Sequence, residues 1–327
     1  MSTHAPSPLQ PNAPPPPSTV HHVAAFVVDH LEKYRQAHTG KHSFPPLVLG
    51  LQGPQGSGKS YLASLLPSTL SSPTYGSLRT VTLSLDDLYL PHSGLTDLAS
   101  SHPANALLKG RGQAGTHEIA LGLDVLRQLK QGGEGPVEVP VFEKSLHAGE
   151  GDRLPKEEWV KVNNPEAVDV VVLEGWMLGF RPCPSPSLPE LYSAAKSSPE
   201  GDDTKKLLSI DYCPPFFLQH SLQDLQQVER FLEDYDKLWK EVDIVVQIRP
   251  EKMGYVWEWR LEQEHNMKAK NGGIGMTDDQ VKQFISRYMP GYELWLQGLS
   301  STSSSWVGKG LRVVVGKDRG VVKVEGF

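Results

Sequence analysis

The fold of this chain is decided by eight consecutive residues, Gly53-Pro54-Gln55-Gly56-Ser57-Gly58-Lys59-Ser60. They follow a short apolar run at residues 47–51 and precede a helix-like stretch at residues 61–66. A glycine-rich turn of the form G-x-x-x-x-G-K-S between a strand and a helix is the pattern of a phosphate-binding P-loop. Its backbone N–H groups turn inward into a concave anion site, and the helix N-terminus adds partial positive charge. The sequence therefore predicts a bound nucleotide.

Each position of this loop has an expected role. Lys59 is expected to reach the β- and γ-phosphates, and the hydroxyl of Ser60 is expected to ligate Mg²⁺. An ordinary flexible Gly/Ser loop is the alternative, and the flanking strand and helix disfavour it. The residues expected to contact the nucleotide are Gly53, Gln55, Gly56, Ser57, Gly58, Lys59, Ser60 and Tyr61.

Composition excludes several other classes of protein. The 327-residue chain has a formal net charge of -6, which argues against a nucleic-acid-binding surface. No apolar stretch approaches the roughly 18 residues that a membrane helix requires. The first residues lack the apolar segment of a secretory signal and contain no arginine before Arg35, so a cytoplasmic protein is expected. Cys183 and Cys213 lack metal-type spacing and are expected to be free thiols.

The order of apolar runs predicts an α/β protein. Residues 1–19 are rich in Pro and Ser and are expected to form a disordered tail before one domain at 20–327. Residues 181–215 are expected to be a surface insertion with little fixed structure. Because strands alternate with helices, we expect a parallel sheet covered on both faces. Strands are expected at 47–51, 80–85, 168–173, 244–248 and 311–315, and helices at 23–36, 118–131, 218–241, 256–271 and 278–299.

Carboxylates follow two of these strands, at the edge where ligands bind in such sheets. Asp86 and Asp87 follow the second strand, and Glu174 follows the third. We expect Asp86 to face an acceptor hydroxyl as a base, and Glu174 to hold Mg²⁺ through water, so that Ser60, Asp86 and Glu174 form the metal side of the site. Asp87 is equally compatible with a helix N-cap or a solvated neighbour.

Cationic residues in glycine-rich loops are candidates for gripping an anionic substrate. Arg111 and His117 lie in residues 110–117, whereas Lys144 and Arg153 flank another glycine-containing loop. Taken singly, each of these charges is also compatible with an ordinary solvated surface position. Arg260 precedes a flexible stretch at 271–273 and is expected to stabilise the transferring phosphoryl group, or alternatively to pair with Glu264 on a helix face.

Several further blocks carry a family resemblance. Residues 84–90 resemble the D-[DS]-[FL]-Y signature of the uridine kinase, pantothenate kinase and phosphoribulokinase group. The blocks at 102–108, 111–117, 151–153, 173–180 and 286–290 look like the D-glycerate 3-kinase family of plants and its fungal ATP-binding homologues. The likeness spans about residues 47–296.

The resemblance implies a monomeric P-loop kinase with three α/β/α layers and a five-stranded parallel sheet in the order 2-3-1-4-5. It also implies ATP and Mg²⁺, transfer to the 3-hydroxyl of D-glycerate to give 3-phosphoglycerate, and a substrate carboxylate surrounded by Arg111, His117, Lys144 and Arg153. A nucleoside, pantothenate or a sugar as acceptor is the alternative within enzymes. A nucleotide-dependent switch or scaffold is the alternative outside them. Residues 317–320 are the candidate for adenine contacts.

Overall fold

The computed structural model describes residues 18–37, 44–132, 135–270, 272–301 and 304–327. The tail expected at residues 1–19 therefore lies almost entirely outside the described residues. Among the described helices, none is long and apolar enough to cross a membrane.

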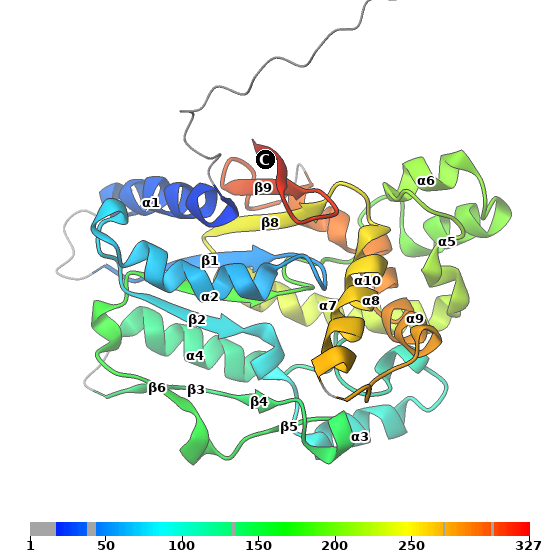
Figure 1. Cartoon of the computed structure of the whole chain (residues 1–327), viewed down its shortest axis with the longest axis horizontal. Coiled ribbons are helices and arrows are strands. Elements are labelled where there is room, and N and C mark those ends of the chain that lie inside the picture. Colours follow the sequence, from blue (N-terminus) through cyan, green and yellow to red (C-terminus); the bar gives the residue numbers. More distant parts are fainter. Residues whose placement is uncertain (1–17, 38–43, 133–134, 271, 302–303) are drawn as a thin grey trace, which may run out of the picture.

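A six-stranded sheet forms the centre of the molecule (Figure 1). Its strands lie in the order β10-β9-β8-β1-β7-β2. All neighbours are parallel except β9 and β10. Counted along the chain, the five parallel strands stand in the order 2-3-1-4-5, the order that the resemblance implied. The strands are β1 Leu47–Gln52, β2 Thr80–Ser84, β7 Val170–Gly175, β8 Ile244–Pro250, β9 Gly310–Val315 and β10 Val321–Gly326.

The expectation of only five strands was wrong, because β10 folds back beside β9 in an antiparallel hairpin. Most side chains of β10 are partly or fully exposed, so its sequence lacks the apolar run that marks the other strands. Two further two-stranded ladders were also not predicted. They pair β3 Val137–Val139 with β6 Val160–Val162, and β4 Phe142–Glu143 with β5 Asp152–Arg153.

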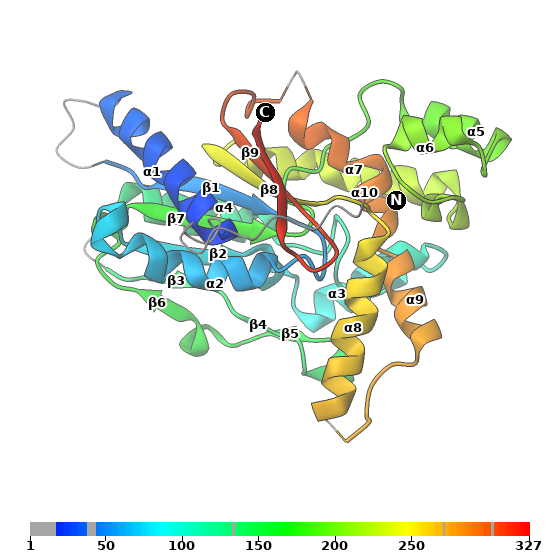
Figure 2. The same ribbon diagram turned by 45° about the horizontal axis from the view of Figure 1, so that its top comes forward.

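Helices cover both faces of the sheet (Figure 2). On one face, α1 Thr19–Ala37 and α2 Lys59–Leu70 pack on Leu47, Leu49 and Leu51 of β1. On the other, α4 Ile119–Gln131 and α7 Leu222–Trp239 pack on the opposite side of the same strand. Because both faces are covered, β1 is buried along its whole length, which explains the apolar sequence of residues 47–51.

The remaining helices lie beyond the carboxyl ends of the strands or at the margins (Figures 1 and 2). They are α3 His92–Ser101, α5 Leu188–Ser197, α6 Asp202–Leu208, α8 Tyr255–Lys270, α9 Asp278–Ser286 and α10 Met289–Leu294. Short 3₁₀ turns complete the description: η1 Pro73–Tyr75, η2 Leu85–Leu88, η3 Ala106–Leu108, η4 His147–Gly149, η5 Lys156–Glu158, η6 Pro165–Ala167, η7 Phe216–Gln219 and η8 Leu296–Ser300.

Two sequence-based expectations about helices were wrong. The helix predicted at 278–299 is divided into α9, α10 and η8. Pro290, which lacks a backbone N–H, stands in the first turn of α10 and is compatible with a helix start but not with a helix interior. The insertion at 181–215, expected to have little fixed structure, contains α5 and α6. Leu188, Ala195 and Leu208 of these helices are buried, so the segment packs on the domain core.

Candidate active site

The P-loop connects β1 to α2 with backbone conformations that require glycine. Gly56 and Gly58 have φ angles of 79° and 86°, in the left-handed region that favours glycine. A Cβ on Gly56 would also lie only 2.5 Å from the Cβ of Trp259. The Ser57 hydroxyl donates to the carbonyl of Pro54 at 2.7 Å and closes the turn. This geometry presents the first N–H groups of α2 to the space in front of the loop.

A cavity of about 470 Å³ opens in front of this loop. Of the residues predicted to contact the nucleotide, Gly53 and Ser57 do not line the cavity. They lie close together within the loop, because a Cβ on Gly53 would be 3.0 Å from the Ser57 hydroxyl. The lining residues are Pro54, Gln55, Gly56, Gly58, Lys59, Ser60, Tyr61, Asp86, Tyr89, Arg111, Lys144, Trp176, Arg260, Gln263, Phe284, Tyr288 and Arg319.

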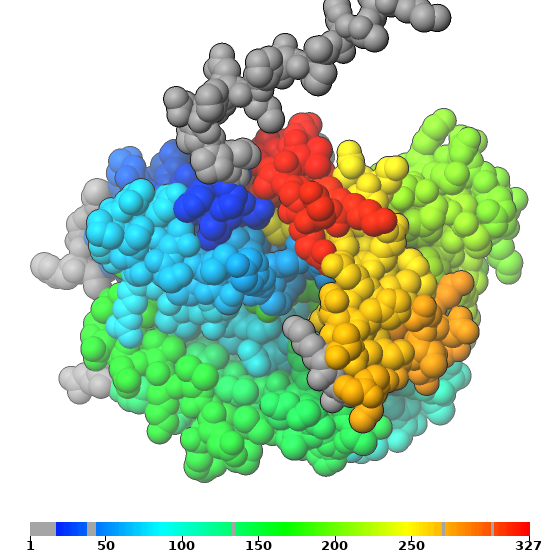
Figure 3. Space-filling view, viewed as in Figure 1, coloured from blue at the N-terminus to red at the C-terminus, as the bar shows by residue number. Residues whose placement is uncertain are grey.

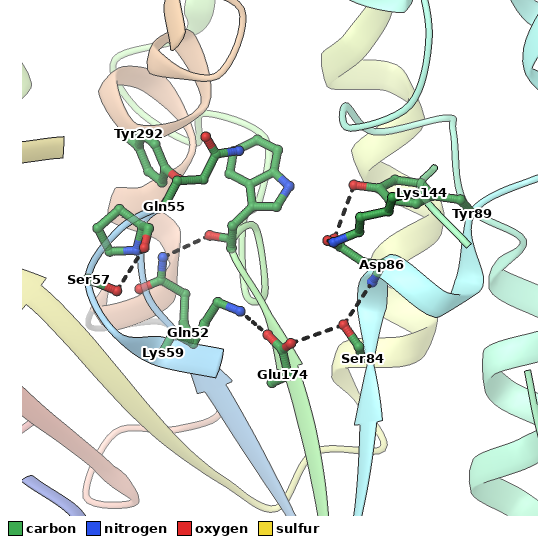
Figure 4. Close-up of polar contacts among 12 residues, drawn as sticks. Gln52, Gln55, Ser57, Lys59, Ser84, Asp86, Tyr89, Lys144, Glu174 and Tyr292 are labelled. Carbon is green, nitrogen blue, oxygen red and sulfur yellow. Dashed lines mark hydrogen bonds and ion pairs between the residues drawn. The ribbon is translucent and has the colours of Figure 1, made fainter. Parts of the chain in front are cut away.

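At the base of the cavity, Lys59 and Glu174 form a buried ion pair (Figure 4). Ser84 donates its hydroxyl to the other Glu174 oxygen at 3.0 Å. Burial lowers the pKa of Lys59 to about 8, while the negative charge of Asp86 acts in the opposite direction. Glu174 thus ends β7 directly beside the loop lysine, as expected from the parallel order of β1 and β7.

Asp86 lies on the opposite wall of the cavity from the P-loop (Figure 4). Its carboxylate accepts a hydrogen bond from the Tyr89 hydroxyl at 3.1 Å and pairs with the Lys144 ammonium at 2.6 Å. Burial by itself raises the pKa of Asp86, but Lys144, with a smaller contribution from Lys59, holds that pKa below its ordinary value. The carboxylate is therefore ionised at neutral pH and able to accept a proton.

Asp87 does not line the cavity, and it supports β4, the strand that precedes Lys144. It accepts the backbone N–H of Phe142 at 3.1 Å. The alternative of an N-cap is not observed, since Ser84 caps the turn η2 by accepting the N–H of Asp86. Burial raises the pKa of Asp87.

Arg111, a candidate for binding the substrate carboxylate, lines the cavity. Its guanidinium donates to the backbone carbonyls of Gly149 at 2.7 Å and of Glu150, and it lies 5.8 Å from the ring centre of Phe142. These partners are neutral groups. The positive charge of Arg111 therefore remains available to an anion in the cavity.

His117 and Arg153 were expected to surround the substrate carboxylate, but neither lines the cavity. His117 is buried, bonded through Nδ1 to the Tyr235 hydroxyl at 2.6 Å and stacked on Tyr89. Burial lowers the pKa of His117 to about 3, so the ring is neutral. Arg153 pairs with Glu118 at 2.5 Å and donates to the carbonyl of Tyr89. Both residues contact Tyr89, and sequence spacing could not reveal that their side chains are engaged by other residues of the protein.

Arg260 forms the pair with Glu264 that the sequence suggested as the alternative, and it also lines the cavity. It pairs with the buried Glu264 at 2.8 Å, stands over the ring of Phe284, and lines the cavity from α8. The carboxylate of Glu264 also accepts the N–H of Met276, so it fixes the connection to α9 as well. The pair holds Arg260 in place on the cavity side of α8.

Sequence reasoning placed residues 317–320 near the adenine, without assigning a side chain. Arg319, in the β9–β10 hairpin, donates to the carbonyl of Gly56 at 2.9 Å and pairs with Glu262 at 2.8 Å. Figure 3 shows the hairpin surface in red against the yellow surface of α8. The indole N–H of Trp259 donates to the carbonyl of Lys317 at 2.6 Å and holds the two together. The sequence therefore indicated the segment that contains Arg319, but it did not predict that Arg319 contacts the P-loop.

The donor set suits Mg²⁺ rather than a metal held by protein alone. Among the described residues, no group of three or more His, Cys, Asp or Glu side chains is arranged to hold a metal. Mg²⁺ usually takes one or two carboxylates, several waters and phosphate oxygens. The Ser60 hydroxyl at the exposed start of α2 and the Glu174 carboxylate at the end of β7 are compatible with such a site.

Comparisons with known proteins agree with this geometry. No family model matches the chain. The uncharacterized kinase mug58 of Schizosaccharomyces pombe is 36% identical over 276 residues, which cover 84% of this chain and 90% of the relative. The chloroplastic D-glycerate 3-kinase of Arabidopsis thaliana is 34% identical over 264 residues, which cover 80% of this chain but 50% of the relative. A solved D-glycerate 3-kinase from Cryptococcus neoformans is 43% identical with a TM-score of 0.82, covering 95% of this chain and 100% of that chain.

The fold and the site define a P-loop kinase, an ATP-using enzyme that transfers a phosphoryl group to an alcohol. Within this class, the chain belongs to the family that contains D-glycerate 3-kinase and its fungal P-loop kinase relatives.

Proposed function

We propose that this protein transfers the γ-phosphoryl group of ATP to the 3-hydroxyl of D-glycerate and releases 3-phosphoglycerate. The observation that carries the proposal is the placement of Asp86 on the wall opposite Lys59 in one cavity. A nucleotide-binding switch would have no role for an ionised carboxylate facing the terminal phosphate. The name of the solved relative at 43% identity supports glycerate as the acceptor.

On the nucleotide side, the backbone of residues 55–60 would bind the phosphates, with Gly53 and Ser57 supporting the turn. Lys59 would exchange its pairing with Glu174 for the β- and γ-phosphates, because a triphosphate offers several negative charges to a buried ammonium. Ser60 and Glu174 would hold Mg²⁺, which when bound neutralises charge on the phosphate oxygens. Tyr61, Gln263 and Arg319 would border the nucleoside.

On the acceptor side, Asp86 would accept the proton of the 3-hydroxyl as that oxygen attacks phosphorus. Lys144 keeps Asp86 ionised, and Arg111 offers a positive charge to the carboxylate of the acceptor. Arg260 would stabilise negative charge on the transferring group from α8. His117 and Arg153 would act indirectly, because both hold Tyr89, whose hydroxyl donates to Asp86.

The remaining expectations stay proposals. Residues 20–327 would form a single kinase domain. The protein would act as a monomer in the cytoplasm on small-molecule substrates, with neither nucleic acid nor a membrane as partner.

An assay of ADP release tests the proposal. D-glycerate, pantothenate and uridine are offered separately with ATP and Mg²⁺, and the product is identified by phosphorus NMR. We expect turnover with D-glycerate and a single phosphomonoester at its 3-position. Turnover with pantothenate or uridine alone would assign a different acceptor. Tight ATP binding without turnover on any acceptor would favour a switch.

A further inference from the structure

A second cavity, of about 640 Å³, adjoins the catalytic one. Arg111, Phe284 and Tyr288 line both cavities, so the two spaces lie on either side of the same side chains. The far wall of the second cavity comes from α3 and from residues 103–110, on the side away from the P-loop.

Positive charge dominates the lining of this second cavity. Lys109, Arg111 and Arg287 face it, and the carboxylate of Glu150 is already paired with His92 at 2.6 Å. The whole protein, by contrast, has a formal net charge of -6. A local excess of cations in an acidic protein points to an anionic ligand.

Arg287 has no acidic partner within the part of the chain that the structure describes. Its guanidinium makes one weak contact, to the carbonyl of Leu107 at 3.5 Å, and its Nε is buried without any partner. Several other arginines pair with a carboxylate, namely Arg153, Arg181, Arg260, Arg312 and Arg319. A partly buried guanidinium without a counter-ion is costly, and a bound anion would remove that cost.

The loops that carry Arg111 and Arg287 are tied together. Gln113, two residues after Arg111 and almost fully buried, donates its side-chain amide to the backbone carbonyl of Arg287. Tyr288 connects this region to the catalytic carboxylate. Burial raises the pKa of Tyr288, Arg287 and Arg111 lower it, and Asp86 raises it, so its hydroxyl lies within electrostatic reach of all three groups.

We propose that the carboxylate of the acceptor binds between Arg111, which lines both cavities, and Arg287, which lines the second, while its 3-hydroxyl faces Asp86. This inference rests on the proposed function and deepens it, because it names Arg287 as a residue that determines specificity for a hydroxy acid. A carboxylate accepts hydrogen bonds from two guanidinium groups at once, which a neutral alcohol of the same size cannot do. Tyr288 would lie alongside the three-carbon chain.

The test compares Arg287→Gln and Arg287→Lys with the unchanged protein. We expect the KM for D-glycerate to rise by at least about tenfold in Arg287→Gln, the scale of losing one charge-assisted hydrogen bond. The KM for ATP should not change. The KM of Arg287→Lys for D-glycerate should lie between those of the unchanged protein and Arg287→Gln. Lysine keeps the positive charge but lacks the planar guanidinium that donates two parallel hydrogen bonds. Lys282→Gln is the matched control, since Lys282 is an exposed cation on α9 that lines neither cavity.

An acceptor without a carboxylate separates a binding role from a structural one. With D-glyceraldehyde, kcat/KM should be the same for Arg287→Gln as for the unchanged protein, whereas with D-glycerate it should fall. Equal losses on both acceptors, or an unchanged KM for D-glycerate, would overturn the assignment of Arg287. If the unchanged protein does not phosphorylate D-glycerate, the proposed function itself fails, and that outcome is seen before any variant is made.

Discussion

The two walls of the catalytic cavity are built in different ways. On the nucleotide wall, most contacts come from the consecutive residues 54–61, held by the backbone geometry of one strand-to-helix turn. On the acceptor wall, the side chains come from segments far apart in the sequence, namely Asp86 of η2, Arg111, Lys144 after β4, Arg260 of α8, Phe284 of α9 and Tyr288 before α10. The first wall is a local property of the sequence. The second exists only after distant segments have packed, so its residues are the ones that folding must position.

This difference predicts how each wall responds to substitution. Removing a group from the nucleotide wall should affect every acceptor equally, because all reactions use the same triphosphate. Removing a group from the acceptor wall should change the KM or the pH dependence for one acceptor while ATP binding stays intact.

The largest effect is expected for Lys59→Ala. The variant loses the cation that contacts the transferring phosphate, so kcat should fall by at least about 10³-fold, the upper range for one electrostatic contact. A coupled assay of ADP release measures it, with Lys33→Ala on the exposed side of α1 as the control. Retention of more than a tenth of the rate would show that Lys59 does not contact the reacting phosphate.

Asp86→Asn comes next. The amide cannot accept the hydroxyl proton, so kcat should fall by at least about 10²-fold, the scale of one general base. The affinity for ATP, measured by titration calorimetry, should be retained because Asp86 belongs to the opposite wall. An unchanged kcat would remove Asp86 from the mechanism.

A smaller effect is expected for Lys144→Ala, and it should depend on pH. Lys144 holds the pKa of Asp86 down against the effect of burial, so its removal raises that pKa. Because Asp86 must be ionised to act, activity on the acid side should be lost at a higher pH in the variant. The profile of kcat/KM against pH measures this shift. An acid limb at the same pH as in the unchanged protein would contradict the proposed coupling.

The smallest effect is expected for Arg319→Ala. Its guanidinium lies over Trp259 and donates to the carbonyl of Gly56, so it supports the loop from a segment distant in sequence. We expect a rise of roughly 2- to 10-fold in the KM for ATP, typical of one hydrogen bond, with no change for the acceptor. If only the acceptor KM changed, the hairpin would belong to the other wall.

Much of the fold was predictable because the central strands are buried on both faces and therefore have unbroken apolar sequences. Strand β10 was missed because its exposed side chains give no such run. The helices α5 and α6 were missed because Pro and Ser around them resemble loop sequence, although Ser187 and Glu190 form a capping box that indicates a helix start. Pro290 was a visible signal for the break after α9.

Some residues of the candidate site were likewise predictable from the sequence, and others were not. Lys59, Asp86 and Glu174 were predictable because each lies near the carboxyl end of one of three neighbouring parallel strands, at the same edge of the sheet. The inward positions of His117 and Arg153 could not be predicted, because their partners Tyr235 and Glu118 lie on segments whose packing the sequence does not state. The partly buried, unpaired guanidinium of Arg287 gave no signal either, since an arginine without a counter-ion is recognised only when its surroundings are known.

The most direct test is a crystal structure with a nonhydrolysable ATP analogue, Mg²⁺ and D-glycerate bound together. We predict the γ-phosphate at Lys59, and the 3-hydroxyl of glycerate between that phosphate and the Asp86 carboxylate. A triphosphate bound outside the P-loop, or an acceptor hydroxyl that contacts a group other than Asp86, would contradict the account.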